Sequence, residues 1–232
     1  MKLILSRHGN TFERGDEVLW VGRRTDLPLT AEGSRQAQHL GNVLRQSGVL
    51  LGGLYCGPLQ RTRQYAEIIA QRNGGMPVLI VDPRLTEIDY GAWEGLSGQE
   101  IIAQFGREEL EAWERSSVWP KAPGWRPSEA TLAHGVTTFM EHLARTQGED
   151  STVLAVTSNG VLRYFLRLAD KIRTEGRGGK VSTGNICILE ALHGNCWVHA
   201  WNIAPDPDCL SDLMSEAPRC VLQVSDETGH DK

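Results

Sequence analysis

Short apolar runs alternate with amphipathic segments along most of the chain. Each run ends at a glycine or at polar residues, which is typical of a short buried strand. The runs that predict strands are residues 3–5, 52–57, 77–81 and 151–157. Strands that alternate with helices favour a mostly parallel sheet covered on both faces. The sequence therefore predicts an α/β protein with three layers, α/β/α, around a mostly parallel central sheet.

The segments between the first three strands carry signals for helix ends. Residues 30–48 begin at Thr30, a good N-cap, and finish at Gly48, which suits a helix exit. Residues 58–75 open with Pro58 and close at a pair of glycines, as the preference for proline at helix starts and glycine at helix ends expects. Both segments are therefore predicted to be helices.

The second half of the chain is less regular. Residues 96–147 form a mostly helical insertion, which we expect to lie over the active site. A helix follows the strand at 151–157, and residues 183–202 read as a hairpin that turns near 193–195. The alternating pattern disappears at about residue 205. We therefore expect a single domain, 1–204, and a poorly ordered tail, 205–232.

Composition narrows the classes of protein that fit. The chain has 232 residues and a net charge of −5, so nothing indicates a nucleic acid or an anionic membrane as partner. An anionic ligand would need a local basic pocket. The five cysteines contain no C-x-x-C pair, which argues against a disulfide scaffold and a zinc ribbon. The apolar run near the start is too short for a signal peptide. We expect a reduced, cytoplasmic protein.

The stretch "SRHGNT" at residues 6–11 places a cation and an imidazole where the first strand ends. Ligands of α/β sheets bind beyond the carboxyl ends of the strands. A neutral His8 can attack a phosphoryl group, and the Arg7 guanidinium offers a fork to phosphate oxygens. Gly9 would let an anion approach the backbone. The alternative is a structural Arg–His pair that a carboxylate satisfies.

Four ordered motifs carry a resemblance to a known family. They are "SRHGNT" (6–11), "GRRTDLPLTAEGSRQA" (22–37), "CGPLQRTRQYAE" (56–67) and "LTEIDYGAWEG" (85–95). Together they resemble the histidine phosphatase superfamily, which includes phosphoglycerate mutases, over residues 2 to about 203. The resemblance implies that His8 is the phosphorylated nucleophile and that Arg7 and Arg61 clamp the phosphate. It also implies that Glu87 protonates the leaving group.

The residues themselves support these roles while leaving alternatives open. Glu87 stands among apolar and small residues, which raise a carboxyl pKa and keep a proton available. It could instead cap a loop or pair with Arg84. Arg61 could be an ordinary surface residue of its helix. Asn10 and Thr11 are candidates for phosphate contacts, or they hold the loop.

The chain departs from the family where a second histidine usually follows a strand in a T-H-G-G motif. Here residues 157–160 read T-S-N-G, so that Ser158 takes the histidine's place. Losing such a donor costs on the order of a hundredfold in rate. Ser158 still offers a hydroxyl, and with Asn159 it stands where the next helix starts, a favourable place for an anion. The alternative for Ser158 is an ordinary N-cap.

The substrate-facing regions also differ from those of the mutases. Arg14 replaces an asparagine of the mutases, and a frequent P-x-G-E-S stretch is blurred at residues 123–129. Arg14, Arg23, Arg24 and Trp125 are candidates for a pocket that takes a larger or more anionic substrate, or they are surface residues.

The function that these features predict is hydrolysis of a small phosphomonoester through a phosphohistidine, with no cofactor and no metal. The alternatives are mutase-like phosphoryl transfer and a catalytically decayed protein that only binds phosphate esters. The expected partner is a small-molecule phosphate ester, with no nucleic acid and no membrane. The chain is expected to act as a monomer or a homodimer.

Overall fold

A single mixed sheet forms the centre of the computed structural model, which describes residues 1–73, 77–121, 124–168, 179–192 and 195–215. Within them the strand order is β3-β2-β4-β1-β5-β6. The first four strands in this order run parallel to one another. Strand β5 pairs antiparallel with β1, and β6 pairs antiparallel with β5. The prediction of a mostly parallel sheet is confirmed. The strands are β1 (Lys2–Arg7), β2 (Leu51–Cys56), β3 (Leu79–Val81), β4 (Thr152–Thr157), β5 (Ile186–Leu192) and β6 (Asn195–Ile203).

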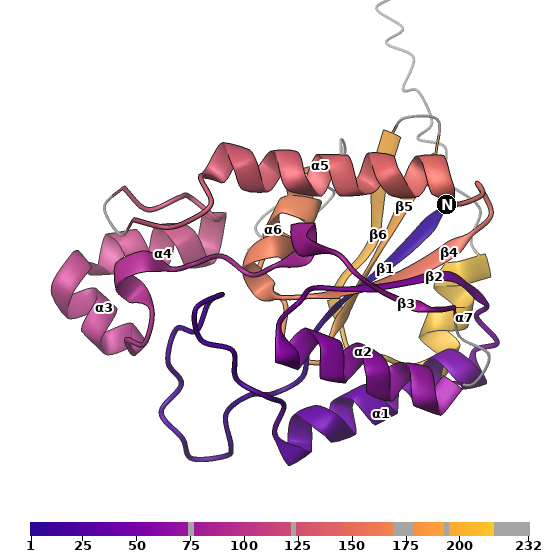
Figure 1. Cartoon of the computed structure of the whole chain (residues 1–232), viewed down its shortest axis with the longest axis horizontal. Coiled ribbons are helices and arrows are strands. Elements are labelled where there is room, and N and C mark those ends of the chain that lie inside the picture. The colour runs from indigo at the N-terminus through magenta and orange to yellow at the C-terminus, as the bar shows by residue number, and fades with distance from the viewer. Residues whose placement is uncertain (74–76, 122–123, 169–178, 193–194, 216–232) are drawn as a thin grey trace, which may run out of the picture.

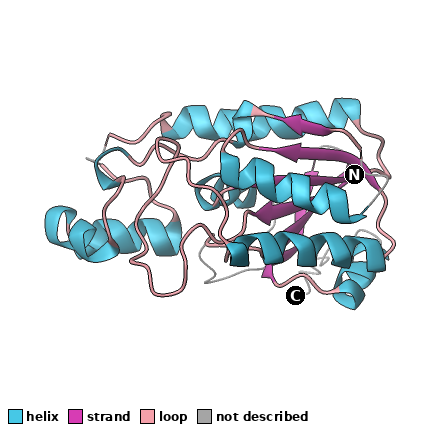
Figure 2. Ribbon diagram, turned by 60° about the horizontal axis from the view of Figure 1, so that its bottom comes forward, coloured by secondary structure: helices cyan, strands magenta, loops and turns pink. Residues whose placement is uncertain are grey.

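Helices cover both faces of this sheet (Figures 1 and 2). One face packs against α1 (Ala31–Gln46), α2 (Gln60–Asn73) and α7 (Pro207–Ser215), and the other packs against α5 (Glu129–Thr146) and α6 (Asn159–Leu168). Each face has its own buried apolar cluster, as a two-sided sheet requires. None of the described helices has the length and apolar character to cross a membrane.

Only part of the predicted insertion lies beyond the sheet. Helices α3 (Gly98–Phe105) and α4 (Arg107–Ser116) project to one side in Figure 1. In contrast, α5 belongs to the helical layer on the sheet, because its Val136, Phe139 and Leu143 are fully buried. The expectation of one insertion over 96–147 is therefore corrected to α3, α4 and the loop that precedes α5.

The predicted tail is also shorter than expected. Pro207–Ser215 forms α7, whose Leu210 is buried with the apolar residues of α1. The side chain of Lys2 donates to the carbonyls of Leu213 and Met214 at the end of this helix. The sequence signal is weak because α7 is short and buries few side chains. The rest of the tail, 216–232, and the hairpin turn at 193–194 lie outside the described residues.

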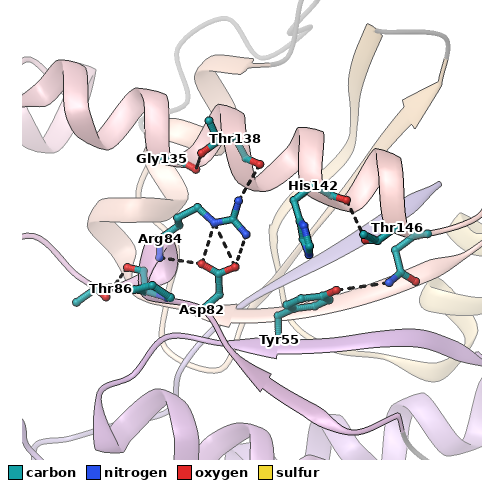
Figure 3. A network of polar contacts seen from close by, with 10 residues as sticks. Tyr55, Asp82, Arg84, Thr86, Gly135, Thr138, His142 and Thr146 are labelled. Atoms are coloured by element: carbon teal, nitrogen blue, oxygen red, sulfur yellow. Dashed lines mark hydrogen bonds and ion pairs between the residues drawn. The ribbon is translucent and has the colours of Figure 1, made fainter.

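A polar network fastens the segment after β3 to the rest of the fold (Figure 3). The Asp82 carboxylate accepts from the Arg84 backbone N–H at 2.9 Å and forms an ion pair with its guanidinium. Arg84 also donates to the Thr138 carbonyl of α5 at 2.9 Å. The Leu85 carbonyl accepts from Thr157 at the end of β4 at 2.8 Å. Glu87 follows two residues later, so its backbone position is fixed from two sides.

Candidate active site

The imidazole of His8 is buried at the carboxyl end of β1. The register pairs Arg7 with Thr157, so the loops after β1 and β4 start side by side. Nδ1 of His8 lies 2.8 Å from the Gly9 carbonyl oxygen, which can only accept, so Nδ1 carries the proton. Nε2 then keeps its lone pair. Burial, followed by the charges of Arg61 and Arg7, holds the pKa of His8 well below 6.5. His8 is therefore a neutral imidazole that could act as a nucleophile.

Gly9 was expected to let an anion approach the backbone, but the structure shows that it is needed for close packing against Gly33. A Cβ there would lie 2.5 Å from the Gly33 carbonyl oxygen and 2.7 Å from the Gly33 Cα. A Cβ on Gly33 would in turn meet the Asn10 carbonyl oxygen at 2.3 Å. The two glycines let the loop after β1 pack on the first turn of α1. That close contact, rather than access for an anion, is what requires a glycine here.

The guanidinium groups of Arg7 and Arg61 act on His8 through their charges, and not all of their N–H donors are used in hydrogen bonds to the described residues. Arg61 lies in the first turn of α2 and is 1% exposed, and its Nη1 and Nη2 donate to the carbonyls of Thr25 at 2.9 Å and Gly22 at 3.0 Å. Arg7 donates to the Val181 carbonyl at 2.6 Å. The Nε–H groups of both are buried and have no partner among the described residues. Burial lowers the pKa of both groups, yet a guanidinium stays charged in proteins. Together they favour an anion.

The Glu87 carboxyl is buried beside these cations. One oxygen accepts from the Ile88 N–H at 2.9 Å and the other from the Gly160 N–H at 3.2 Å. Burial raises the pKa of Glu87 above 4.5, while the Ile88 N–H and Arg61 act in the opposite direction. The carboxyl can therefore keep a proton and still be stabilised after losing it. Gly160 stands in the first turn of α6, so Glu87 occupies the helix start that the sequence suggested for phosphate.

Gly160 leaves room for this carboxyl, which gives a testable prediction. A Cβ at this position would lie 2.4 Å from Glu87 Oε1 and 2.9 Å from the Tyr90 hydroxyl. Gly160→Ala is expected to displace Glu87 and to lower kcat for a phosphate ester by about a hundredfold, a typical cost of misplacing a catalytic group by about 1 Å.

The matched control is Gly135→Ala in α5, where a Cβ meets nothing within 4 Å. It is expected to keep full activity and to raise the free energy of unfolding by about 0.5–1 kcal/mol, because alanine is the better helix former. Steady-state rates and thermal melts measure both effects. Wild-type activity in folded Gly160→Ala would contradict the geometry given for Glu87.

Ser158 and Asn159 differ in what they can reach. Ser158 is fully buried, and its hydroxyl has no hydrogen-bond partner among the described residues, so it does not cap α6. It is also absent from the lining of the cavity at His8. Asn159 does line that cavity, and its Oδ1 accepts from the Val181 N–H at 2.8 Å. Asn159 therefore borders the cavity, and Ser158 does not.

A cavity of about 850 Å³ joins the remaining candidates. It is lined by Arg7, His8, Asn10, Thr11, Arg14, Arg61, Glu87 and Asn159. Within the described part of the chain, no group of three or more His, Cys, Asp or Glu side chains could hold a metal ion. Two arginines, a neutral imidazole and a buried carboxyl thus line one cavity.

Three of the suggested substrate residues do not line this cavity. Arg24 forms an ion pair with Asp89 at 2.9 Å, which directs it away. Trp125 is buried in an aromatic cluster, with its ring 5.1 Å from that of Trp93. Arg23 is exposed and outside the lining. For these three the expectation of a substrate contact is corrected.

Sequence reasoning missed another arginine of the cavity, Arg163 of α6. It is 1% exposed, and its Nη1 donates to the Trp113 carbonyl at 2.7 Å and to the Ser117 hydroxyl at 2.9 Å. Its guanidinium stacks on the Trp113 ring at 4.7 Å. The signal was its position four residues after Asn159, which places both on one helix face. Arg163 therefore ties α4 to the cavity wall.

Comparison with known proteins decides the family. Residues 3–204 match the model of the histidine phosphatase superfamily, branch 1. The chain belongs to this superfamily. A 2,3-bisphosphoglycerate-dependent phosphoglycerate mutase of Methylobacterium sp. (strain 4-46) is 30% identical over 176 residues, 75% of this chain and 82% of that protein. The mutase of Azorhizobium caulinodans is 28% identical over 177 residues, 75% and 84% of the two chains.

Solved histidine phosphatases share the fold. A mycobacterial glucosyl-3-phosphoglycerate phosphatase, solved with VO3, has a TM-score of 0.74 at 24% identity, covering 88% of this chain and 99% of its own. The alpha-ribazole phosphatase of Shigella flexneri has a TM-score of 0.64 at 24% identity, covering 89% and 98%. A phosphohistidine is general to the family, and phosphatases stand among the structural neighbours.

Proposed function

We propose that the protein is a phosphomonoester hydrolase that works through a phosphohistidine at His8. The observation that carries the proposal is the meeting of three groups in one cavity. They are a neutral imidazole with a free Nε2 lone pair, two buried guanidinium groups with unpartnered donors, and a buried carboxyl with a raised pKa. This set supplies a nucleophile, an anion clamp and an acid.

The reaction takes two steps. In the first, the Nε2 lone pair of His8 attacks phosphorus while the bond from phosphorus to the ester oxygen breaks, and Glu87 protonates the departing oxygen. In the second, Glu87 takes a proton from water, whose oxygen attacks phosphorus. The bond between phosphorus and Nε2 breaks, inorganic phosphate leaves, and neutral His8 and protonated Glu87 are restored.

The arginines hold the phosphoryl oxygens throughout. Arg7 and Arg61 line the cavity, and the Nε–H of each is buried without a partner among the described residues, so their positive charges can stabilise charge that develops on those oxygens. With Ser158 in place of the family's second histidine, the remaining donors on α6 are the Asn159 amide and Arg163, both on the cavity wall. Asn10 and Thr11 complete the proposed contacts from the loop after β1.

Hydrolysis is favoured over mutase-like transfer by the exposure of the cavity rim. A mutase must shield its phosphoenzyme from water, whereas Glu13, Arg14 and Val18 on this rim are exposed. Water therefore has access to a phosphorylated His8. Transfer between two positions of one substrate would instead give an isomerised ester and no free phosphate.

The test is phosphate release from a panel of sugar phosphates, phosphoglycerates, nucleotides and an aryl phosphate. We expect turnover of at least one ester without added metal. Isomerised ester without free phosphate would support the mutase alternative. No turnover on the whole panel would overturn the proposal and favour a protein that only binds phosphate esters.

The pH dependence of kcat/KM gives a further prediction. The first step needs neutral His8 and protonated Glu87, and burial moves the two pKa values in the directions that populate this state. Activity should fall at low pH as His8 gains a proton, at a pKa well below 6.5, and fall at high pH as Glu87 loses one, at a pKa above 4.5. A rate profile for an alkyl phosphate measures this. A profile without a falling limb on the alkaline side would contradict the assignment.

A further inference from the structure

The cavity is much larger than its phosphoryl-binding end. The groups that handle the phosphoryl group, Arg7, His8, Arg61 and Glu87, lie together at the carboxyl ends of β1 and β4. The full volume of about 850 Å³ falls in the range of pockets that enclose drug-sized molecules, about 300–1,000 Å³. Most of the space therefore remains for the alcohol part of the ester.

One side of this space is apolar. A single segment between β1 and α1 supplies it, and we call its cavity-lining residues the apolar wall: Phe12, Val18, Leu19, Trp20 and Val21. The segment extends from the end of β1 toward the side of α3 and α4 in Figure 1. Val18 is 67% exposed and lies at the rim of the cavity. The wall is thus an apolar surface next to the reaction centre.

Backbone contacts hold the wall in place. The Trp20 N–H donates to the Leu96 carbonyl at 2.8 Å, and the Trp20 carbonyl accepts from the Gly95 N–H at 2.8 Å. The Trp20 ring meets the rings of Tyr90 and Trp93 edge to face, at 5.1 Å in both cases. A pocket wall that is fixed before binding loses little conformational entropy when a ligand covers it.

The charged side of the rim offers little to a second anion. Arg35 is paired with Glu32 at 2.6 Å, and Lys180 with Glu114 at 3.3 Å. An anionic substituent would have to displace these carboxylates. Arg14, the other rim cation among the described residues, is exposed, so water and salt screen its attraction. The rim as a whole therefore suits an uncharged group.

We propose that the substrate is a phosphate monoester of an uncharged alcohol whose alkyl or aromatic part lies on the apolar wall. The inference rests on the proposed hydrolase function and names its substrate class. The phosphoryl group supplies the only charge, which the buried arginines neutralise. The alcohol contributes affinity through the apolar area that it covers.

A homologous series of esters tests the proposal. We expect kcat/KM to rise from methyl to butyl to hexyl phosphate by about two- to fourfold per methylene, fourfold being the factor for a fully buried methylene. Phenyl phosphate should exceed glycerol phosphate, which is similar in length and polar. The reaction at phosphorus is the same for the alkyl esters, so the slope reports contact with the alcohol.

A rim variant and a matched control localise the effect. Val18→Asp is expected to reduce the ratio of hexyl to methyl phosphate kcat/KM by about fivefold, because the apolar contact is lost for the longer ester alone while the added charge acts on both esters alike. The control is Val78→Asp, a valine that is 84% exposed and outside the cavity lining. It should keep the wild-type ratio.

Binding of alkylphosphonates, measured by calorimetry, separates this inference from the proposed function. Turnover with a kcat/KM that does not change with alkyl chain length, or with a preference for glycerol phosphate, would overturn the substrate class and leave the hydrolase function standing. No turnover, but phosphonate affinity that rises with chain length and rises less steeply in Val18→Asp, would support the substrate class and overturn the hydrolase function. If there is no turnover and the phosphonate affinity does not change with chain length, both the substrate class and the hydrolase function are overturned.

Discussion

Glu87→Gln is expected to lower kcat/KM for a hexyl or sugar phosphate by about 10²–10⁴-fold, the usual contribution of a general acid. Glutamine has nearly the same shape, and its carbonyl oxygen can keep one of the two hydrogen bonds that the carboxyl oxygens accept from the Ile88 and Gly160 N–H groups. It has no acidic proton to give to the departing alcohol. The same variant should lose less than about tenfold on p-nitrophenyl phosphate, whose leaving group departs as a stable phenolate.

The difference between the two esters distinguishes proton donation from damage to the fold. A structural defect would lower kcat/KM for both esters alike, and that result would contradict the role given to Glu87. The matched control is Glu141→Gln, an exposed glutamate of α5, which should behave as wild type on both esters. Steady-state kinetics at a pH near the wild-type maximum is sufficient.

His8→Ala is expected to reduce phosphate release from every ester at least about a thousandfold, because the nucleophile itself is lost. The variant should keep its affinity for alkylphosphonates within about tenfold, since Arg7 and Arg61 retain their contacts with carbonyls. Loss of turnover with retained affinity is the signature of a residue that acts in the chemical step. Phosphate assays and calorimetry on one preparation measure both.

An exposed histidine supplies the comparison. His134→Ala changes a surface side chain of α5 and should leave rate and affinity unchanged. Substantial turnover in His8→Ala would mean that water attacks the ester directly or that another nucleophile acts. Either result would contradict the proposed mechanism.

The parts of the site that the sequence could predict are those set by strand and helix ends. His8 follows a buried strand and Arg61 stands in the first turn of a helix after the next strand, so parallel pairing brings them to the same edge of the sheet. Glu87 was implied by the family resemblance and supported by its apolar neighbours, and burial does raise its pKa. The resemblance selected these three residues, and local pattern and topology agree with it.

Other features depend on packing between distant elements. Arg163 becomes part of the cavity wall because α4 ends beside α6, which helix periodicity does not show. A glycine is required at position 9 because the loop there packs closely on α1, and Arg24 forms an ion pair with Asp89. Trp125 is drawn into an aromatic cluster. In each case the deciding partner lies far away in the sequence.

Ser158 shows the same limit. The motif places this residue at the start of a helix, where either a cap or an anion contact is reasonable. In the structure its hydroxyl is buried without a partner among the described residues, and the helix start is used by Glu87. The next residue, Asn159, lines the cavity instead. Of two neighbouring residues, therefore, the packing of the fold decides which one borders the cavity.

The most direct test of the account is to locate the phosphate on the enzyme during turnover. Wild-type protein mixed with p-nitrophenyl phosphate is quenched within milliseconds in alkali, and its peptides are analysed by mass spectrometry. The account predicts a base-stable, acid-labile phosphate on His8 that forms and decays at least as fast as turnover. Turnover without a phosphoenzyme, or with the phosphate on another residue, would contradict it.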